Sequence, residues 1–246
     1  MIIEFERRGQ KWQANLDQAF DCSSTFGEPE REPRAWYAEP VKIEPIVMGD
    51  WVGAVKEGAS VNFFQVQLVP HGNGTHTECY GHIDKGHQKL NAHLLEHHFI
   101  AYFHRQGLKE QLGNRILSLE DLPDIDWQEI EVFAIEAKGI SFPQDFSGTN
   151  PPYFDPALCA FLAEKGVKHL ICNLPSVDRE EDGGALAAHK AFWQYPENTR
   201  QYSTITELAV FPSEMEAGYY YLNLQSAPLH SDAVPSRPIF YKSKRV

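Results

Sequence analysis

The chain has 246 residues, of which 42% are hydrophobic and 23% charged, as is usual for a soluble globular protein that can bury a substantial core. Its formal net charge of −12 argues against nucleic acid or an anionic membrane as partner, because both attract positively charged surfaces. No apolar run approaches the ~18 residues of a membrane helix, and the start, MIIEFERRGQ, lacks the basic-then-apolar order of a signal peptide.

The cysteines bear on the compartment and on metal chemistry. None of the four pairs in a CxxC spacing, so a zinc site built from cysteine is not expected. Free thiols are typical of a reducing compartment, and we therefore expect a cytoplasmic protein.

The first half of the chain predicts strands and one long loop. Residues 2–16 alternate apolar and polar side chains around an RRGQ break, which predicts a β-hairpin. Residues 23–45 are rich in proline and charge and predict an extended loop of the kind that often has a function. A strand is predicted over 61–69, and it leads into a stretch of histidines, which we therefore expect on a loop just past the end of the strand.

The second half predicts more strands and two helices. EIEVFAIEA (129–137) is typical of a buried strand. A helix is predicted from Asp155, which can cap it, through Pro156 in its first turn to Gly166 at its end. The remaining predicted elements are a strand after Gly166, a short helix over 184–193, and strands over 204–211 and 218–225. We expect one α/β domain over 1–246 with a mixed, strand-rich sheet, in which 1–50 form an N-terminal hairpin and extended loop.

The stretch HGNGTHTECYGH (71–82) concentrates groups that can bind a metal. His71, His76, Glu78 and His82 lie within twelve residues, on a segment too glycine-rich for a helix. In an extended segment His76 and Glu78 point the same way, because residues two apart share a side. Imidazole and carboxylate together suit zinc or manganese. The alternative is a hydrogen-bonded turn whose histidines are incidental.

The same stretch resembles the signature of the cyclase superfamily of metal-dependent hydrolases, which includes bacterial kynurenine formamidases and isatin hydrolases. That signature reads His-x-Gly-Thr-His-x-Asp-x-Pro-x-His. The chain keeps Gly-Thr-His at 74–76, a carboxylate two residues on and a histidine six residues on. It departs in having Glu78 for the aspartate, Tyr80 for the proline, and His71 five residues before His76 instead of four.

The resemblance extends over about residues 60–240. Residues 166–178, ending in Pro-Ser-Val-Asp178, resemble the family's helix end, strand and turn, and His189 matches the histidine that follows. Glu207 matches the glutamate that begins the next shared segment. Ala227-Pro-Leu and Pro235-Ser-Arg-Pro-Ile resemble the closing strands.

The resemblance implies a site, a fold and an assembly. Its metal ligands would be His71, His76, Glu78, His189 and Glu207, holding one or two ions of zinc or, alternatively, manganese. Glu78 could bridge two ions, and His82 would be the acid/base group beside them. Asp178 would orient a ligand histidine, or would simply cap a turn. The implied fold is a swivelling β/β/α domain, and the implied assembly is a homodimer or homotetramer.

The function that follows is hydrolysis of an amide, lactam or ester bond in a small molecule by a water that the metal activates. One alternative is a metal-binding family member without hydrolytic activity. Another is a dehydratase or ring-closing enzyme that uses the same metal.

Other residues have simpler interpretations. A nucleophilic role for Cys79 is disfavoured, because the metal loop explains its position. Three aromatic residues either line a substrate pocket or, for at least half of them, pack in the core: Trp36, Tyr37 and Trp51. A second group of histidines is expected to be structural or at the surface: His87, His93, His97, His98 and His104.

Overall fold

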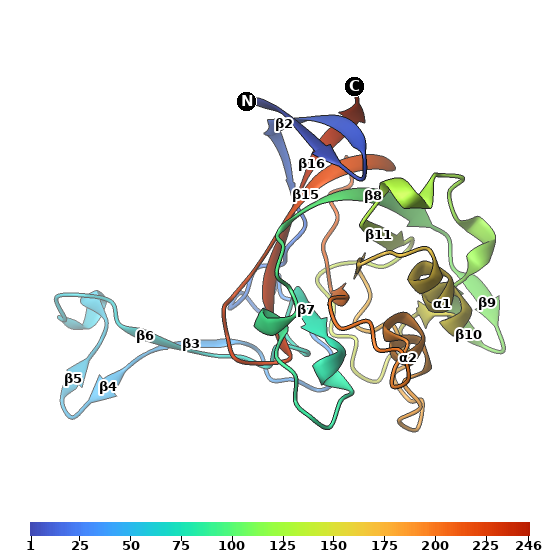
Figure 1. Ribbon diagram of the computed structural model, residues 1–246. Helices are drawn as coiled ribbons and strands as arrows, with labels where there is room; N and C mark the ends of the chain where they lie inside the picture. Colours follow the sequence, from blue (N-terminus) through green and yellow to red (C-terminus); the bar gives the residue numbers. More distant parts are fainter.

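A closed barrel of strands is the centre of the computed structural model, which describes all 246 residues (Figure 1). The strand order is β1-β2-β16-β15-β8-β11-β13-β14-β7, and a further pairing of β16 with β7 closes the ring from β16 to β7. The strands of this sheet are β1 (Ile2–Arg7), β2 (Gln10–Asp21), β7 (His76–Cys79), β8 (His98–Gln106), β11 (Val132–Ala137), β13 (His169–Cys172), β14 (Thr204–Glu207), β15 (Gly218–Ser226) and β16 (Ala233–Arg245).

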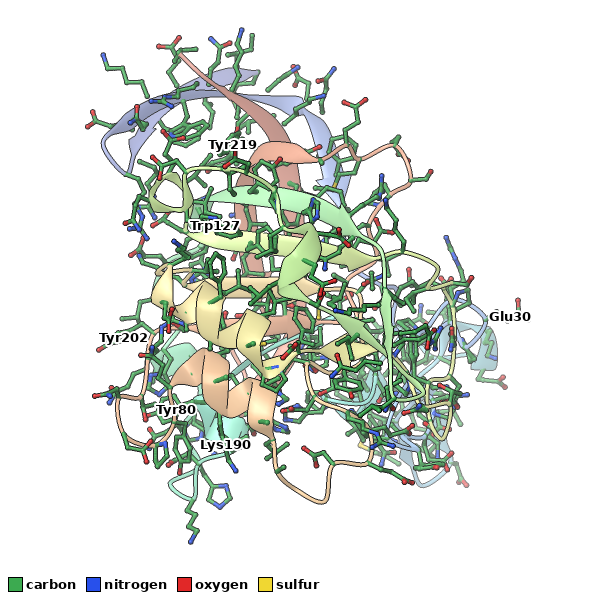
Figure 2. All side chains as sticks on the ribbon, turned by 90° about the vertical axis from the view of Figure 1, so that its right-hand side faces the viewer. Glu30, Tyr80, Trp127, Lys190, Tyr202 and Tyr219 are labelled. Atoms are coloured by element: carbon green, nitrogen blue, oxygen red, sulfur yellow. The ribbon has the colours of Figure 1, made fainter.

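Four neighbouring strands, β8, β11, β13 and β14, run parallel, and the remaining pairings in the sheet are antiparallel. Parallel neighbours need crossover connections, and helices α1 (Pro156–Glu164) and α2 (Ala187–Trp193) lie in two of them. Figure 2 looks onto these helices, with Trp127 labelled near α1 and Lys190 on α2. The mixed, strand-rich α/β sheet predicted from the sequence is confirmed.

The predicted helix from Asp155 is confirmed as α1, and its ends follow from local chemistry. The Asp155 carboxylate accepts a hydrogen bond from the backbone N–H of Ala157 at 2.9 Å, and Pro156 occupies the first helical position. Gly166 follows the helix with φ +79°, a left-handed conformation that glycine adopts without a steric penalty.

The core has two layers because β11 is buried on both faces. Phe133 and Ile135 pack towards the helices, whereas Val132 and Ala134 pack into the layer that includes Phe103. On the helix side, Trp127 packs against Phe133 and Phe161 with ring centroids 5.1 and 5.3 Å away. Burial on both faces explains why residues 132–135 (VFAI) are continuously apolar.

The predicted N-terminal hairpin is confirmed as β1 and β2. They pair in antiparallel register around Arg8 and Gly9, which both have positive φ. A smaller sheet joins β9 (Lys109–Gln111), β10 (Asn114–Leu117) and β12 (Tyr153–Phe154). No helix in the structure has the length and apolar character that a membrane crossing requires.

Residues 41–69, which we call the arm, extend away from the barrel (Figure 1). The arm contains two short ribbons, formed by β3 (Lys42–Pro45) with β6 (Phe64–Gln67) and by β4 (Val47–Met48) with β5 (Trp51–Val52). The strand predicted over 61–69 is therefore wrong in length and place. Its alternating pattern belongs to an exposed ribbon and not to the barrel.

The prediction that the histidines lie on a loop is wrong for part of the stretch. Residues His76–Cys79 form β7, which pairs with β14 on one side and β16 on the other. The glycines that suggested a loop lie before and after this strand, at 72, 74 and 81.

Candidate metal centre

Strands β7 and β14 place two predicted ligands directly opposite each other. His76 and Glu207 are register partners in this antiparallel pair, so their side chains project from the same face. His76 Nε2 lies 3.4 Å from Glu207 Oε2. Glu78 is two residues from His76 and shares that face, whereas Thr77 points the other way and hydrogen-bonds Thr206 at 2.7 Å.

The Gly-Thr of the Gly-Thr-His motif anchors β7 and orients its histidine. Gly74 has φ +64°, and a Cβ there would lie 2.5 Å from Ser24 Oγ, so a larger residue does not fit. The Thr75 hydroxyl donates to the Leu208 carbonyl at 2.7 Å, which ties β7 to the end of β14. The Gly74 carbonyl accepts from His76 Nδ1 at 3.0 Å. That bond fixes the ring so that Nε2 faces Glu207.

Helix α2 brings His189 to the same place. Its Nδ1 donates to Asp178 Oδ2 at 2.6 Å, and its Nε2 lies 3.0 Å from Glu78 Oε1 and 3.9 Å from Glu207 Oε1. Asp178 also accepts from the backbone N–H groups of Ala188 and His189, so it holds the helix and the ring together. Glu207 is fixed in turn by the Val177 backbone N–H at 2.9 Å.

His71 and His82 lie at the more open side of the cluster. His71 Nδ1 is 3.1 Å from Glu78 Oε2, and its Nε2 is 2.8 Å from Asp232 Oδ2. His82 Nδ1 is 3.9 Å from Glu78 Oε2 and 3.8 Å from Asp232 Oδ2. The His82 side chain is 32% exposed, whereas those of Glu78 and His189 are almost fully buried.

The carboxylates of the cluster favour positively charged groups between them. Burial by itself would lower the pKa of His189, but hydrogen bonds to Asp178 and Glu78 outweigh burial and raise that pKa to about 10. In the same way, burial is outweighed by Asp232 and Glu78, which raise the pKa of His71 to about 10. The hydrogen bond with His71 and the nearby ring of His82 hold the pKa of Asp232 below its usual range. The carboxylates therefore stabilise whatever cation lies between them, whether protons or a metal.

Two buried atoms of the cluster test whether a metal ion fits between these side chains. His76 Nε2 and Glu78 Oε2 are buried and make no well-aligned hydrogen bond, although Glu207 Oε2 lies 3.4 Å from the first atom and His71 Nδ1 lies 3.1 Å from the second. An unpaired buried polar atom is costly unless something else binds it. Three overlapping groups of side chains place their ligand atoms within 4.8 Å of one another: His71 with His76 and Glu78; His71 with His82 and Asp232; and Glu78 with His82 and His189. Nitrogen and oxygen donors in this number and spacing fit a divalent cation such as zinc or manganese.

All the site residues predicted from the sequence meet in this cluster, although their individual roles as ligand, acid/base group or orienting group stay predictions. The predicted set is His71, His76, Glu78, His82, Asp178, His189 and Glu207. Sequence reasoning missed Asp232, which precedes β16 and whose carbonyl accepts from the Cys79 N–H at 3.0 Å. Its only sequence signal is that it is an acidic residue between the two segments that resemble the closing strands.

Other sequence interpretations have mixed outcomes. Burial raises the pKa of the Cys79 thiol to about 12, which opposes a nucleophilic role. The expectation that at least half of three aromatic residues pack in the core is wrong, because Trp36 and Tyr37 are exposed and Trp51 is half-buried on the arm. Their loop and ribbon have no sheet face to pack against. The second histidine group contributes no member to the three candidate metal groups.

Comparison with known proteins decides the family. The family model described as "Putative cyclase" matches residues 16–179, which is more than half of the chain. The chain belongs to the cyclase family. Among curated proteins, this cyclase-family chain is similar to a kynurenine formamidase from Bacillus cytotoxicus, with 27% identity over 191 residues that cover 75% of this chain and 82% of the relative.

Solved structures share the fold of this cyclase-family chain. A protein described as a potential metal-dependent hydrolase with cyclase activity superposes with a TM-score of 0.62 at 14% identity, covering 92% of this chain and 98% of that one. Isatin hydrolase A from Labrenzia aggregata gives 0.61 at 11% identity, covering 91% and 93%. At these identities the likeness concerns the fold alone.

Proposed function

We propose that this cyclase-family chain is a metal-dependent hydrolase that cleaves the C–N bond of an amide or lactam in a small molecule, with an ester as the other candidate bond. The observation that carries the proposal is the convergence of buried His76 Nε2 and Glu78 Oε2, neither of which makes a well-aligned hydrogen bond, with His189 and Glu207. The similarity to a kynurenine formamidase, and the fold shared with isatin hydrolases, support amide and lactam substrates.

The residues divide into those that would hold the metal and those that handle protons. His71, His76, Glu78, His189 and Glu207 would bind one or two ions of zinc or, alternatively, manganese. Such an ion supplies Lewis acidity to a carbonyl group and lowers the pKa of water from ~15.7 to about 7.

His82 is the residue placed for proton transfer. Its ring is more exposed than the buried ligands, and its Nδ1 lies at nearly equal distances from Glu78 and Asp232. An imidazole can both accept and donate a proton, as general acid–base catalysis requires. We propose that His82 accepts the proton of the attacking water and returns it to the leaving nitrogen.

Asp178 would act on the proposed ligand His189 and not on the metal itself. Its carboxylate holds a proton on His189 Nδ1, so that Nε2, which faces Glu78, is the nitrogen that would be presented to a metal. The same oxygen pair accepts two backbone N–H groups of α2, which fixes where the ring can point.

A second function is favoured by one observation. Both nitrogens of His71 are engaged by carboxylates, Glu78 on one side and Asp232 on the other. If the metal is held without His71, the chain would be a family member that binds metal but does not hydrolyse amides. A dehydratase or ring-closing enzyme on the same centre would be recognised by the product it forms.

The test combines metal analysis with substrate screening. Purified protein should contain zinc or manganese by mass spectrometry, and it should turn over at least one of a panel of aromatic N-formyl amides, isatin-like lactams and small esters. In His82→Ala, turnover should fall by about 100-fold or more while the metal content is kept. The exposed His98→Ala serves as the matched control.

The outcomes separate the candidates. Bound metal with no turnover of any substrate, with or without added manganese, would favour the binding protein. Loss of metal together with activity in His82→Ala would make His82 a ligand and refute its role in proton transfer.

A further inference from the structure

A second cavity lies at the opposite end of β13 and β14 from the metal centre. Its volume is about 300 Å³, and His93, Phe99 and His169 are among the residues that line it; we call it the His93 cavity. His169 begins β13 and is the register partner of Thr204, which begins β14. Glu207 of the metal centre ends β14, about 10 Å further along the strand. No residue that lines this cavity belongs to the candidate metal groups.

His93 is a buried histidine whose nitrogens are both unpaired. The residue is 8% exposed, and neither Nδ1 nor Nε2 makes a hydrogen bond or an ion pair. Leaving such an atom unpaired costs about 1–3 kcal/mol. The ring packs between Tyr80 and Tyr202, whose ring centroids lie 5.0 and 6.2 Å away, and Figure 2 shows both tyrosines at the same edge of the molecule. These contacts hold the ring in the cavity wall but satisfy neither nitrogen, which indicates that a polar ligand completes the cavity.

The charged groups in the cavity wall balance one another. Lys168 and Glu96 both line the cavity, and Lys168 Nζ lies 3.6 Å from Glu96 Oε1 and 3.3 Å from Glu131 Oε1. Arg7 pairs with the same two glutamates, and its Nε lies 3.1 Å from Glu131 Oε2. Two basic and two acidic side chains thus form one network, which has no net charge.

Arg200 adds a positive charge that no carboxylate balances. Its guanidinium donates to the backbone carbonyls of Phe192, at 2.7 Å, and Val167, and burial lowers its pKa to about 10. The pKa of His169 is lowered first by burial and then by the positive charges of Lys168 and Arg200, so Arg200 lies close to the cavity. With three basic groups against two acidic ones, the surroundings of the cavity carry one surplus positive charge. They therefore favour a single anion and disfavour a metal ion.

The apolar lining favours an anion that carries a ring. Phe99 packs against the His169 ring, with centroids 4.4 Å apart. Leu95 and Tyr202 also line the cavity and are 65% and 60% exposed. A volume of about 300 Å³ is at the lower end of the range for small-molecule sites, which typically combine apolar walls with a few polar groups. One aromatic ring is an occupant of suitable size.

We propose that the His93 cavity binds a small aromatic carboxylate, separately from the metal centre. A neutral imidazole has one N–H to donate, so His93 can bind a carboxylate oxygen without carrying a charge. Lys168 and Arg200 supply the positive charge that the carboxylate balances, and the ring of the ligand lies against Phe99 and Tyr202.

The first experiment uses the purified holoprotein and benzoate as the probe, with binding measured by calorimetry. Benzamide keeps the ring and the shape of benzoate but has no charge, and acetate keeps the charge but has no ring. We expect benzoate to bind at least about 10-fold more tightly than either, because hydrogen bonds to a charged group and burial of a ring both contribute. Absence of benzoate binding at millimolar concentration, or equal affinity for benzamide or acetate, would overturn the proposal.

The second experiment places the probe in the cavity by substitution. His93→Phe keeps an aromatic ring and removes both nitrogens, and it should weaken benzoate binding by about 10-fold or more. His98→Phe is the matched control, because His98 is exposed and does not line the cavity, and its affinity should differ from that of wild type by less than about 2-fold. Equal affinities in the two variants would refute the proposal.

Competition separates this cavity from the metal centre, where a carboxylate could also bind. Acetohydroxamate is a bidentate metal ligand, and we expect it to leave benzoate binding unchanged. If it displaces benzoate, the probe binds at the metal centre and the proposal is wrong. Circular dichroism and metal content check that the variants fold. If His93→Phe does not fold, Lys168→Gln replaces it, with an expected loss of affinity of at least about 3-fold, and an unchanged affinity refutes the proposal.

Discussion

Replacing Asp178 by asparagine tests how the centre is oriented. In the wild type, Asp178 Oδ2 accepts both the Nδ1–H and the backbone N–H of His189, while Oδ1 accepts from Ala188. An asparagine has only one acceptor oxygen, so one of these donors must face an NH₂ group. Where the NH₂ faces the ring, His189 must carry its proton on Nε2, the atom that points at Glu78.

The magnitude follows from this change of tautomer. Substitution of a residue that orients a metal-bound histidine typically weakens metal affinity by about 10- to 100-fold, which corresponds to about 1.4–2.7 kcal/mol. We expect that loss for Asp178→Asn, measured by competition with a chelator of known affinity. Turnover at saturating metal should fall as well.

A matched control separates orientation from helix capping. Asp155→Asn makes the same substitution at the start of α1, where the carboxylate accepts from Ala157 and touches no site residue. It should lower stability slightly and leave metal affinity unchanged. If Asp178→Asn binds metal as tightly as wild type does, or if both variants lose affinity equally, the orienting role of Asp178 is refuted.

Three further predictions concern metal removal, the missed carboxylate and acid stability. Chelation should lower the unfolding temperature by about 5–11 °C, because an ion at 100 times its Kd contributes ~2.7 kcal/mol to the free energy of unfolding. Added zinc or manganese should restore the unfolding temperature, and an unchanged midpoint would argue against a structural ion. Asp232→Asn should weaken metal binding about 10-fold by releasing His71, as measured by calorimetry, and unaltered binding would remove Asp232 from the site. Burial lowers the pKa of His169 to about 3. Because this lies below the unfolded value of ~6.5, neutral histidine favours the fold, and stability falls as the pH drops from about 6.5 towards 3. Urea titrations should therefore show that, between about pH 4 and 6, the free energy of unfolding of the wild type rises with pH about 1.4 kcal/mol per pH unit more steeply than that of His169→Gln. Equal slopes for the two proteins would contradict this prediction.

The sequence by itself determined the features that depend on neighbours in the chain. Helix α1 follows from a capping aspartate, a proline and a terminal glycine within twelve residues. The double burial of β11 is visible in its apolar run VFAI at 132–135. The spacing of His76 and Glu78 places both on one side of any extended segment, and the family pattern added His189 and Glu207.

Only the tertiary structure decided what depends on pairing between distant segments. The stretch around His76 is a barrel strand because β14 and β16 flank it, and no local pattern reveals which strands will close a ring. Asp232 reaches His71 from 161 residues away through that closure. The pattern over 61–69 predicts a strand, but only 64–67 form one, on an exposed ribbon, because an apolar pattern does not show what covers it. Hydrogen bonds between strands are made by backbone groups that every residue carries, so their partners are chosen by the fold as a whole.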